Sequence, residues 1–109
     1  MKTEVETRNH MCVVKVAGEV DLYSSPELRK AITKAVPAAE ALAAVDLSGV
    51  TYMDSSGVAT LVEGLRESDK KGIAFALVAP SQPVLKVLSL SRLDKVFDIR
   101  ENLDEASGV

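Results

Sequence analysis

Two neighbouring hydroxyl side chains stand in the segment Asp54-Ser55-Ser56-Gly57, between an apolar stretch and an amphipathic one. The pattern predicts that a strand ends before this segment and that a helix begins in it. The first backbone N–H groups of a helix have no partner inside the helix, so the hydroxyls stand beside free donors. Asp54 is a typical N-cap residue, whose carboxylate is expected to accept a hydrogen bond from the N–H of Ser56 or Gly57. Ser55 then occupies the first helical position and points outward.

Two interpretations of these serines are open at this point. In the first, the segment is only a helix cap, since serine and aspartate are common at helix N-termini. In the second, Ser55 becomes phosphorylated, because a phosphate there would lie on free N–H groups at the positive end of the helix dipole. Gly57 lacks a Cβ and therefore lets other backbone or a ligand approach closely.

The helix after the motif is predicted from apolar residues at i, i+3, i+4 and i+7. These positions are Val58, Leu61, Val62 and Leu65, and the opposite face is expected to carry Thr60, Glu63, Arg66 and Glu67. Lys70-Lys71-Gly72 is the expected stop, with positive charge at the negative end of the helix and a glycine cap. Gly64 lies inside this helix, where it either permits close packing or is merely tolerated at a cost of about 1 kcal/mol.

The rest of the chain alternates strand and helix patterns. Strands are expected over residues 3–8, 11–17, 42–47, 73–79 and 96–99. Gly18 is expected to end the second of these strands, and Ser48-Gly49 the third. Two antiparallel strands followed by strand–helix units predict an α/β fold with a mixed sheet of four to five strands packed with helices.

Three further helices complete this prediction. The first runs from Pro26 through Val36, where Pro37 stops it. The alanine-rich stretch 38–44 is ambiguous, and a prolonged helical region stays open for part of it. Ser24 or Ser25 caps this helix, and Ser24 would form a capping box with Glu27. The other two are a helix capped by Ser81, with Val84, Leu85 and Leu88 buried, and a short final helix over 104–106 capped by Asn102.

The composition limits the classes of function. The 109 residues fit one domain, expected to span residues 1–109. Aromatic residues are only 4%, which predicts an aliphatic core and no stacking platform for single-stranded nucleic acid, and the net charge of -3 argues against binding to a phosphate backbone. There is no signal-peptide pattern and no apolar stretch long enough to span a bilayer, so we expect a cytoplasmic protein without membrane contact.

The chain also offers little for catalysis of its own. A serine hydrolase needs a base beside its nucleophile, yet His10 is the single histidine and there is no Gly-x-Ser-x-Gly elbow. No Gly-rich phosphate loop or dinucleotide fingerprint is present. Cys12, the single cysteine, lies in an apolar run and is expected to be buried, so neither a disulfide within the chain nor a cysteine metal cluster can form. We therefore expect a switch or binding module without its own cofactor or metal, and not an enzyme.

Four segments carry a resemblance to a known family. The stretch VTYMDSSG at 50–57 resembles the phosphorylation-site motif of the anti-sigma factor antagonists, which are STAS-domain proteins. The stretch GEVDL at 18–22 is similar to the family's strand end and loop, SPEL at 25–28 to the start of its first helix, and VLSLSRLDKVF at 87–97 to its third helix and last strand. The resemblance covers nearly the whole chain in the right order and implies a single STAS domain.

The resemblance also implies a mechanism. Unphosphorylated members bind an anti-sigma factor and free a sigma factor to engage RNA polymerase. The anti-sigma factor is often also a serine kinase that modifies the first serine of the motif, here Ser55, and a metal-dependent serine phosphatase reverses this step. ATP and Mg²⁺ belong to the kinase. Asp54, Ser56 and Gly57 match the flanking motif positions, and Asp21 matches the family position expected beside the phosphorylation site. The resemblance implies that these four residues take part in binding the partner.

Two other functions stay as alternatives. Some STAS-like proteins are accessory subunits of a lipid-transporting ABC transporter, where the fold clamps the ATPase without a phosphorylation cycle. The complete Asp-Ser-Ser-Gly motif favours the switch, although Ala59 stands where many members of the family have a second glycine. The third interpretation is a serine hydrolase, which ester turnover that is lost in Ser55→Ala would support.

Overall fold

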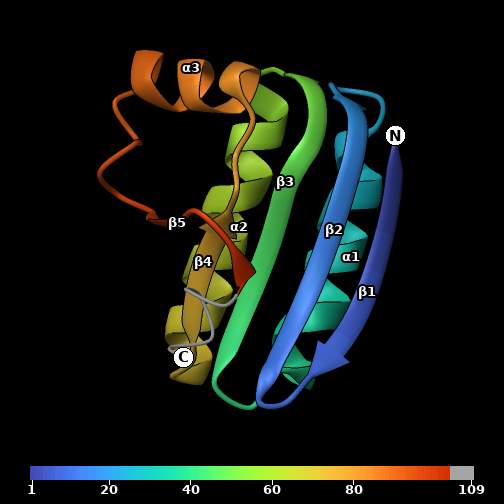
Figure 1. The fold of residues 1–109 in the computed structure, drawn as a ribbon, viewed down its shortest axis with the longest axis vertical. Coiled ribbons are helices and arrows are strands. Elements are labelled where there is room, and N and C mark those ends of the chain that lie inside the picture. The colour runs from blue at the N-terminus through green and yellow to red at the C-terminus, as the bar shows by residue number, and fades with distance from the viewer. Residues whose placement is uncertain (104–109) are drawn as a thin grey trace.

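The structure is a computed structural model that describes residues 1–103, which form five strands and three helices (Figure 1). In chain order these are β1 (Lys2–Arg8), β2 (Met11–Val20), α1 (Ser25–Ala38), β3 (Leu42–Met53), α2 (Ser55–Lys71), β4 (Ala74–Val78), α3 (Gln82–Leu90) and β5 (Asp98–Arg100). The final helix expected over 104–106 lies outside the described residues. None of the helices in the described part of the chain is long and apolar enough to cross a membrane.

The five strands form one mixed sheet, in the order β1-β2-β3-β4-β5. β1 runs antiparallel to β2, and every later neighbour is parallel to the strand before it. Helices α1 and α2 make the crossovers from β2 to β3 and from β3 to β4, and they cover one face of the sheet (Figure 1). The predicted α/β class and mixed sheet are confirmed. Because the strands after β1 are parallel, the carboxyl ends of β2 and β3 meet at one edge of the sheet.

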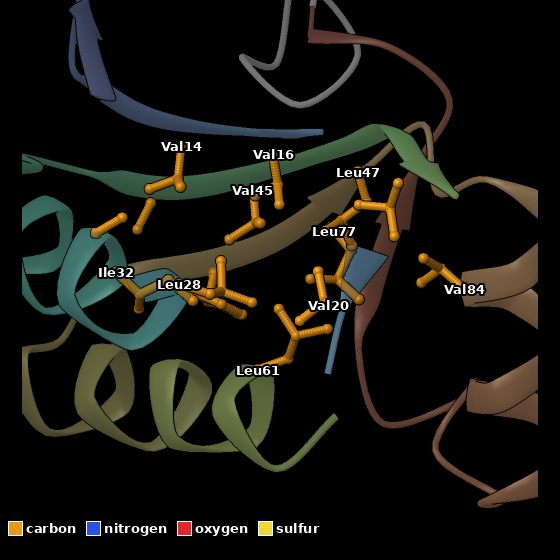
Figure 2. Close-up of a cluster of buried hydrophobic side chains, with 14 of the residues drawn as sticks. Val14, Val16, Val20, Leu28, Ile32, Val45, Leu47, Leu61, Leu77 and Val84 are labelled. Atoms are coloured by element: carbon orange, nitrogen blue, oxygen red, sulfur yellow. The ribbon is translucent and has the colours of Figure 1, made fainter. Parts of the chain in front are cut away.

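The main core lies between this sheet and the two crossover helices. Figure 2 shows Val14 and Val45 of the central strands among the same buried side chains as Leu28 of α1 and Leu61 of α2. All four are fully buried, and the core is aliphatic as predicted, with Phe75 and Phe97 as its aromatic members. A smaller buried cluster lies apart from it and consists of Met11, Val13, Leu42, Ala44, Ala76 and Val78.

Two strands are longer than predicted. β2 continues past Gly18 to Val20, and β3 continues past Ser48-Gly49 to Met53. The pairing of these strands changes register between Lys15 and Ala17 and again after Gly18, so both glycines lie in an irregularity inside the sheet. A Cβ on Gly49 would lie 3.0 Å from the Cβ of Ala17. The expectation that glycine ends each strand is wrong, because both glycines lie within their strands at this bulge. Gly49 permits the close approach of β2 to β3, and Gly18 adopts a positive φ of 95°.

Three predictions for the helices also need correction. α1 continues through Pro37 to Ala38, since Pro37 stands in the last turn and the N–H of Ala39 still bonds the carbonyls of Ala35 and Val36. Thr60 is buried rather than on the solvent face, and its hydroxyl donates to the carbonyl of Ser56 (2.9 Å). Leu85 is only half-buried.

The glycine cap predicted at Gly72 is confirmed, and of the two alternatives left open for Gly64 the structure favours close packing. Gly72 ends the helix in the left-handed region at φ 72°. A Cβ on Gly64 would meet the ring of Phe75 at 2.8 Å and Ile32 at 2.9 Å, so this glycine allows α2 to lie close to its neighbours.

Candidate functional site

The site begins where β3 passes into α2. Asp54 is the N-cap of α2 in extended backbone geometry, and its carboxylate accepts a hydrogen bond from the N–H of Ser56 at 3.0 Å. The Ser56 hydroxyl donates to the same carboxylate oxygen. Ser55 is the first residue of the helix, and its exposed side chain has no hydrogen bond to any described residue. The predicted cap is confirmed, and of the two serines it leaves Ser55 as the accessible hydroxyl.

Gly57 lies beneath this turn and is buried. A Cβ on this residue would stand 2.7 Å from Cγ of Met53 and 2.9 Å from Cγ1 of Val20. Close approach was expected here from other backbone or from a ligand. The structure instead brings two core side chains against Gly57, so the glycine sets how closely the start of α2 lies on the sheet.

The end of β2 lies directly beside this helix start. Val20 pairs with Met53 in the sheet, and the N–H of Asp54 donates to the carbonyl of Val20 at 3.1 Å. The loop of residues 21–24, which we call the β2–α1 loop, therefore leaves the sheet next to the N-terminus of α2, at the upper end of the sheet in Figure 1. Asp21 was expected beside the motif, and it is the first residue of this neighbouring loop.

The carboxylate of Asp21 bonds within its own loop. Its Oδ1 accepts from the N–H groups of Tyr23 (3.0 Å) and Ser24 (2.9 Å), and the Ser24 hydroxyl lies 3.1 Å away. These bonds hold the pKa of Asp21 below its ordinary value, with the Ser24 N–H contributing most and the Ser24 hydroxyl next. The stabilised form is thus the ionised carboxylate, which keeps its negative charge at neutral pH.

The predicted capping box at Ser24 is wrong. The Ser24 hydroxyl makes no cap bond to α1; it accepts from the N–H of Asp21 (2.9 Å) and donates to the carbonyl of Glu19 (3.0 Å). Ser24 and Ser81 both stand at N-cap positions, but neither side chain bonds the helix that follows it. The Ser81 hydroxyl donates instead to the carbonyl of Val50 at 2.6 Å. That bond ties the start of α3 to β3.

Sequence reasoning missed two residues at this end of the sheet. Leu22 and Tyr23 of the β2–α1 loop are 68% and 90% exposed. Contiguous exposed apolar side chains mark interaction surfaces, and aromatic residues are enriched at the centres of interfaces. The sequence did carry a signal for them: two large apolar residues between Asp21 and the serines that precede Pro26.

Other candidate groups lie away from the motif. His10 follows β1 at the opposite end of β2, where its Nδ1 is 2.7 Å from the carboxylate of Glu40. A groove of about 500 Å³ between α1 and α2 is bordered by the ion pair of Arg29 and Glu63 (2.7 Å), and none of the predicted site residues lines it. Cys12 is fully buried, as predicted. Within residues 1–103 no cluster of three or more His, Cys, Asp or Glu side chains is arranged to hold a metal ion.

Comparisons with known proteins identify the family of the chain. A family model described as the STAS domain matches residues 2–106. The anti-sigma-B factor antagonist of Bacillus subtilis is 32% identical over 101 residues, which cover 91% of this chain and 90% of that protein. The family match runs through the β2–α1 loop and the Asp-Ser-Ser-Gly segment alike.

Solved structures give the same result. The crystal structure of an anti-sigma factor antagonist from Mycobacterium paratuberculosis has a TM-score of 0.87 and 31% identity, covering 98% of this chain and 91% of that one. The Bacillus cell fate determinant SpoIIAA in its phosphorylated form has a TM-score of 0.74 and 24% identity over 98% and 97% of the two chains, and it shares the fold. Sequence, fold and relatives together place this chain in the STAS-domain family of anti-sigma factor antagonists.

Proposed function

We propose that this protein binds an anti-sigma factor through the surface around the N-terminus of α2 and that phosphorylation of Ser55 switches this binding off. The observation that carries the proposal is the contrast between the two serines. The Ser56 hydroxyl is held by the Asp54 carboxylate, whereas Ser55 is exposed at the first turn of the helix. A kinase can therefore reach Ser55 without dismantling the cap.

The fold supports a phosphate at this position. Phosphorylation adds about −1.5 to −2 charges at neutral pH, and the N-terminus of a helix favours negative charge. The N-cap bond from Ser56 to Asp54 does not involve the Ser55 side chain, so it can persist in the modified protein. The switch then acts through the charge of the surface and requires no refolding of the domain.

The effect on a partner follows from desolvation. A partner that packs against a neutral Ser55 hydroxyl would have to accommodate a dianion next to the Asp54 carboxylate. An unpaired charge buried in an interface costs about 3–5 kcal/mol, which corresponds to a loss of affinity of at least a hundredfold. The unphosphorylated protein is thus the binding form, and the phosphoprotein is the released form.

The kinase and phosphatase are partners in this proposal. The anti-sigma factor itself supplies the serine kinase activity, with its own ATP and Mg²⁺, and a separate serine phosphatase restores the hydroxyl. We propose no catalytic step for this chain, because its one histidine lies at the other end of β2 from Ser55. The transporter accessory role is less well supported, since the Bacillus subtilis relative at 32% identity and the Mycobacterium paratuberculosis structure at 31% are both anti-sigma factor antagonists.

Binding measurements on three variants test the proposal. Each kinase-type anti-sigma factor of the source organism is purified and titrated with wild-type protein, Ser55→Ala and Ser55→Asp in a calorimeter. We expect wild type and Ser55→Ala to bind one of them equally, and Ser55→Asp to bind it at least about tenfold more weakly. Ser89→Asp is the matched control, because it adds the same charge at another exposed helical serine.

Phosphosite mapping completes the test. After incubation of the wild-type protein with the bound anti-sigma factor and Mg-ATP, mass spectrometry should place the phosphate on Ser55. Modification of Ser56 alone, or unchanged affinity of a correctly folded Ser55→Asp protein, would contradict the proposal.

A further inference from the structure

The β2–α1 loop presents two large apolar side chains to solvent. Tyr23 is 90% exposed, the highest value among the large hydrophobic side chains of the described residues, and Leu22 is 68% exposed. The loop joins the end of β2 at Val20 to the start of α1 at Ser25. Neither side chain supports the core, so the fold gives no reason for apolar groups at this place.

The loop that carries them is braced from within. Asp21 accepts hydrogen bonds from the N–H groups of Tyr23 and Ser24, and its own carbonyl accepts from Ser25 (2.8 Å). The Ser24 hydroxyl adds a bond to the carbonyl of Glu19 (3.0 Å). A loop held in one conformation loses little entropy when a partner binds its tip, so it suits a preformed contact.

The loop also stands next to Ser55. Val20, the last residue of β2, accepts a hydrogen bond from the N–H of Asp54, and Ser55 follows directly. Both the loop and the helix start leave the same edge of the sheet (Figure 1). A partner that covers Ser55 and extends along this edge of the sheet toward β2 meets the loop as well.

We propose that Leu22 and Tyr23 are the apolar anchors that seat the anti-sigma factor over Ser55, and that Asp21 is the residue that positions them. This inference rests on the proposed function. The occupant is an apolar cleft of the anti-sigma factor, with a hydrogen-bond acceptor for the phenol. Continuity with the Ser55 surface supports this occupant, as does the preference of binding hot spots for tyrosine.

The two parts of the surface then have different tasks. The anchors provide affinity by burying apolar area, which serine hydroxyls cannot do. Ser55 provides control, because its charge changes while the anchors stay as they are. The Asp21 carboxylate acts through the loop and is a positioning residue.

Calorimetry with the anti-sigma factor that binds the wild type tests the anchors. We expect Tyr23→Ala and Leu22→Ala to weaken binding by about tenfold or more each, and Tyr23→Phe to lose much less, since it keeps the ring. Leu90→Ala is the matched control, because Leu90 is 76% exposed but lies on α3. All variants should melt within a few degrees of the wild type, as these side chains are exposed.

The role of Asp21 has its own test. Asp21→Ala should weaken binding as the anchor variants do, whereas Asp21→Asn, which keeps an acceptor oxygen, should restore most of the affinity. The N–H groups of Tyr23 and Ser24 should exchange faster with solvent in Asp21→Ala than in Asp21→Asn.

The possible outcomes separate the two proposals. If no kinase-type anti-sigma factor binds the wild type, the proposed function fails and this inference fails with it. If one binds and Tyr23→Ala and Leu22→Ala bind as tightly as Leu90→Ala, the anchors are refuted while the proposed function stands. A dimer of the protein alone that Tyr23→Ala abolishes would instead assign the loop tip to self-association, which also overturns the inference.

Discussion

Replacing Gly57 by alanine tests how tightly the start of α2 is seated on the sheet. The new Cβ would lie 2.7 Å from Cγ of Met53 and 2.9 Å from Cγ1 of Val20, whereas ordinary contacts begin at 3.4 Å. Met53 has a flexible side chain that can move aside. Val20 is β-branched and fully buried, so it has few other rotamers to adopt.

The expected magnitude is the difference between two opposing effects. Alanine gains up to about 1 kcal/mol over glycine in helix propensity. Overpacking of a filled core costs about 1–3 kcal/mol. We therefore expect Gly57→Ala to lower the free energy of unfolding by about 1 kcal/mol, the middle of the resulting range, and to lower the melting temperature by about 5 °C.

Urea denaturation followed by circular dichroism measures this change. Ala59→Gly is the matched control, since Ala59 is exposed on the same helix and the substitution reports the helix-propensity difference alone. If Gly57→Ala were more stable than the wild type by the amount that Ala59→Gly loses, the close packing inferred around Gly57 would be refuted. A Gly57→Ala protein of reduced stability that still binds the anti-sigma factor normally would show that this glycine serves the fold.

Three further predictions concern the cap, the end of α2 and the β2–α1 loop. Asp54→Ala should cost about 1 kcal/mol in urea denaturation, and Asp54→Asn less, because only alanine removes the acceptor for the Ser56 N–H. Gly72→Ala should also cost about 1 kcal/mol, because alanine is strained at the left-handed φ of 72° even though its Cβ would touch nothing within 4 Å. An unchanged stability would contradict this backbone strain. The Asp21 carboxyl should titrate by NMR with a pKa below its ordinary value of 3.8. Because the folded-state pKa is the lower one, the stability that the loop hydrogen bonds of Asp21 provide is fully present above pH 3.8 and is lost as the pH falls through the folded-state pKa. A titration midpoint of Asp21 at or above 3.8 would refute the role of these hydrogen bonds.

The regular elements were predictable because their patterns are local. The apolar stripe beginning at Val58 fixes α2, and Asp54 with Gly72 marks its two ends. The cap position also decides which serine comes first in the helix, and Ser55 is that residue. Its role as the phosphorylation site comes from the family resemblance and stays a prediction. The predicted class of fold follows from the alternation of such elements.

The errors arose where a neighbouring segment decides the outcome. Any local rule marks Gly49 as a strand breaker, yet the approach of Ala17 from β2 makes it part of the sheet. Thr60 follows the polar face of its helix in the sequence, but it is buried and borders the groove between α1 and α2.

Ser24 shows a different kind of error, in which two local motifs compete for one hydroxyl. In a capping box the Ser24 hydroxyl would accept a hydrogen bond from the N–H of Glu27. In the structure it instead accepts from the N–H of Asp21 and donates to the carbonyl of Glu19. Both are compatible with the sequence, and only the path of the chain from β2 into α1 decides between them.

The strand order has a consequence for how the domain is made. Position in the sheet follows position in the chain from β1 to β5, so every strand pairs with the strand synthesised just before it. No strand among the described residues has to be inserted between two earlier ones. During translation the sheet can therefore grow by addition at one edge, beginning with the β1–β2 hairpin, whose contacts are the most local. The order also means that β3, which directly precedes the Ser55 motif, can pair with β2 before β4 and β5 leave the ribosome.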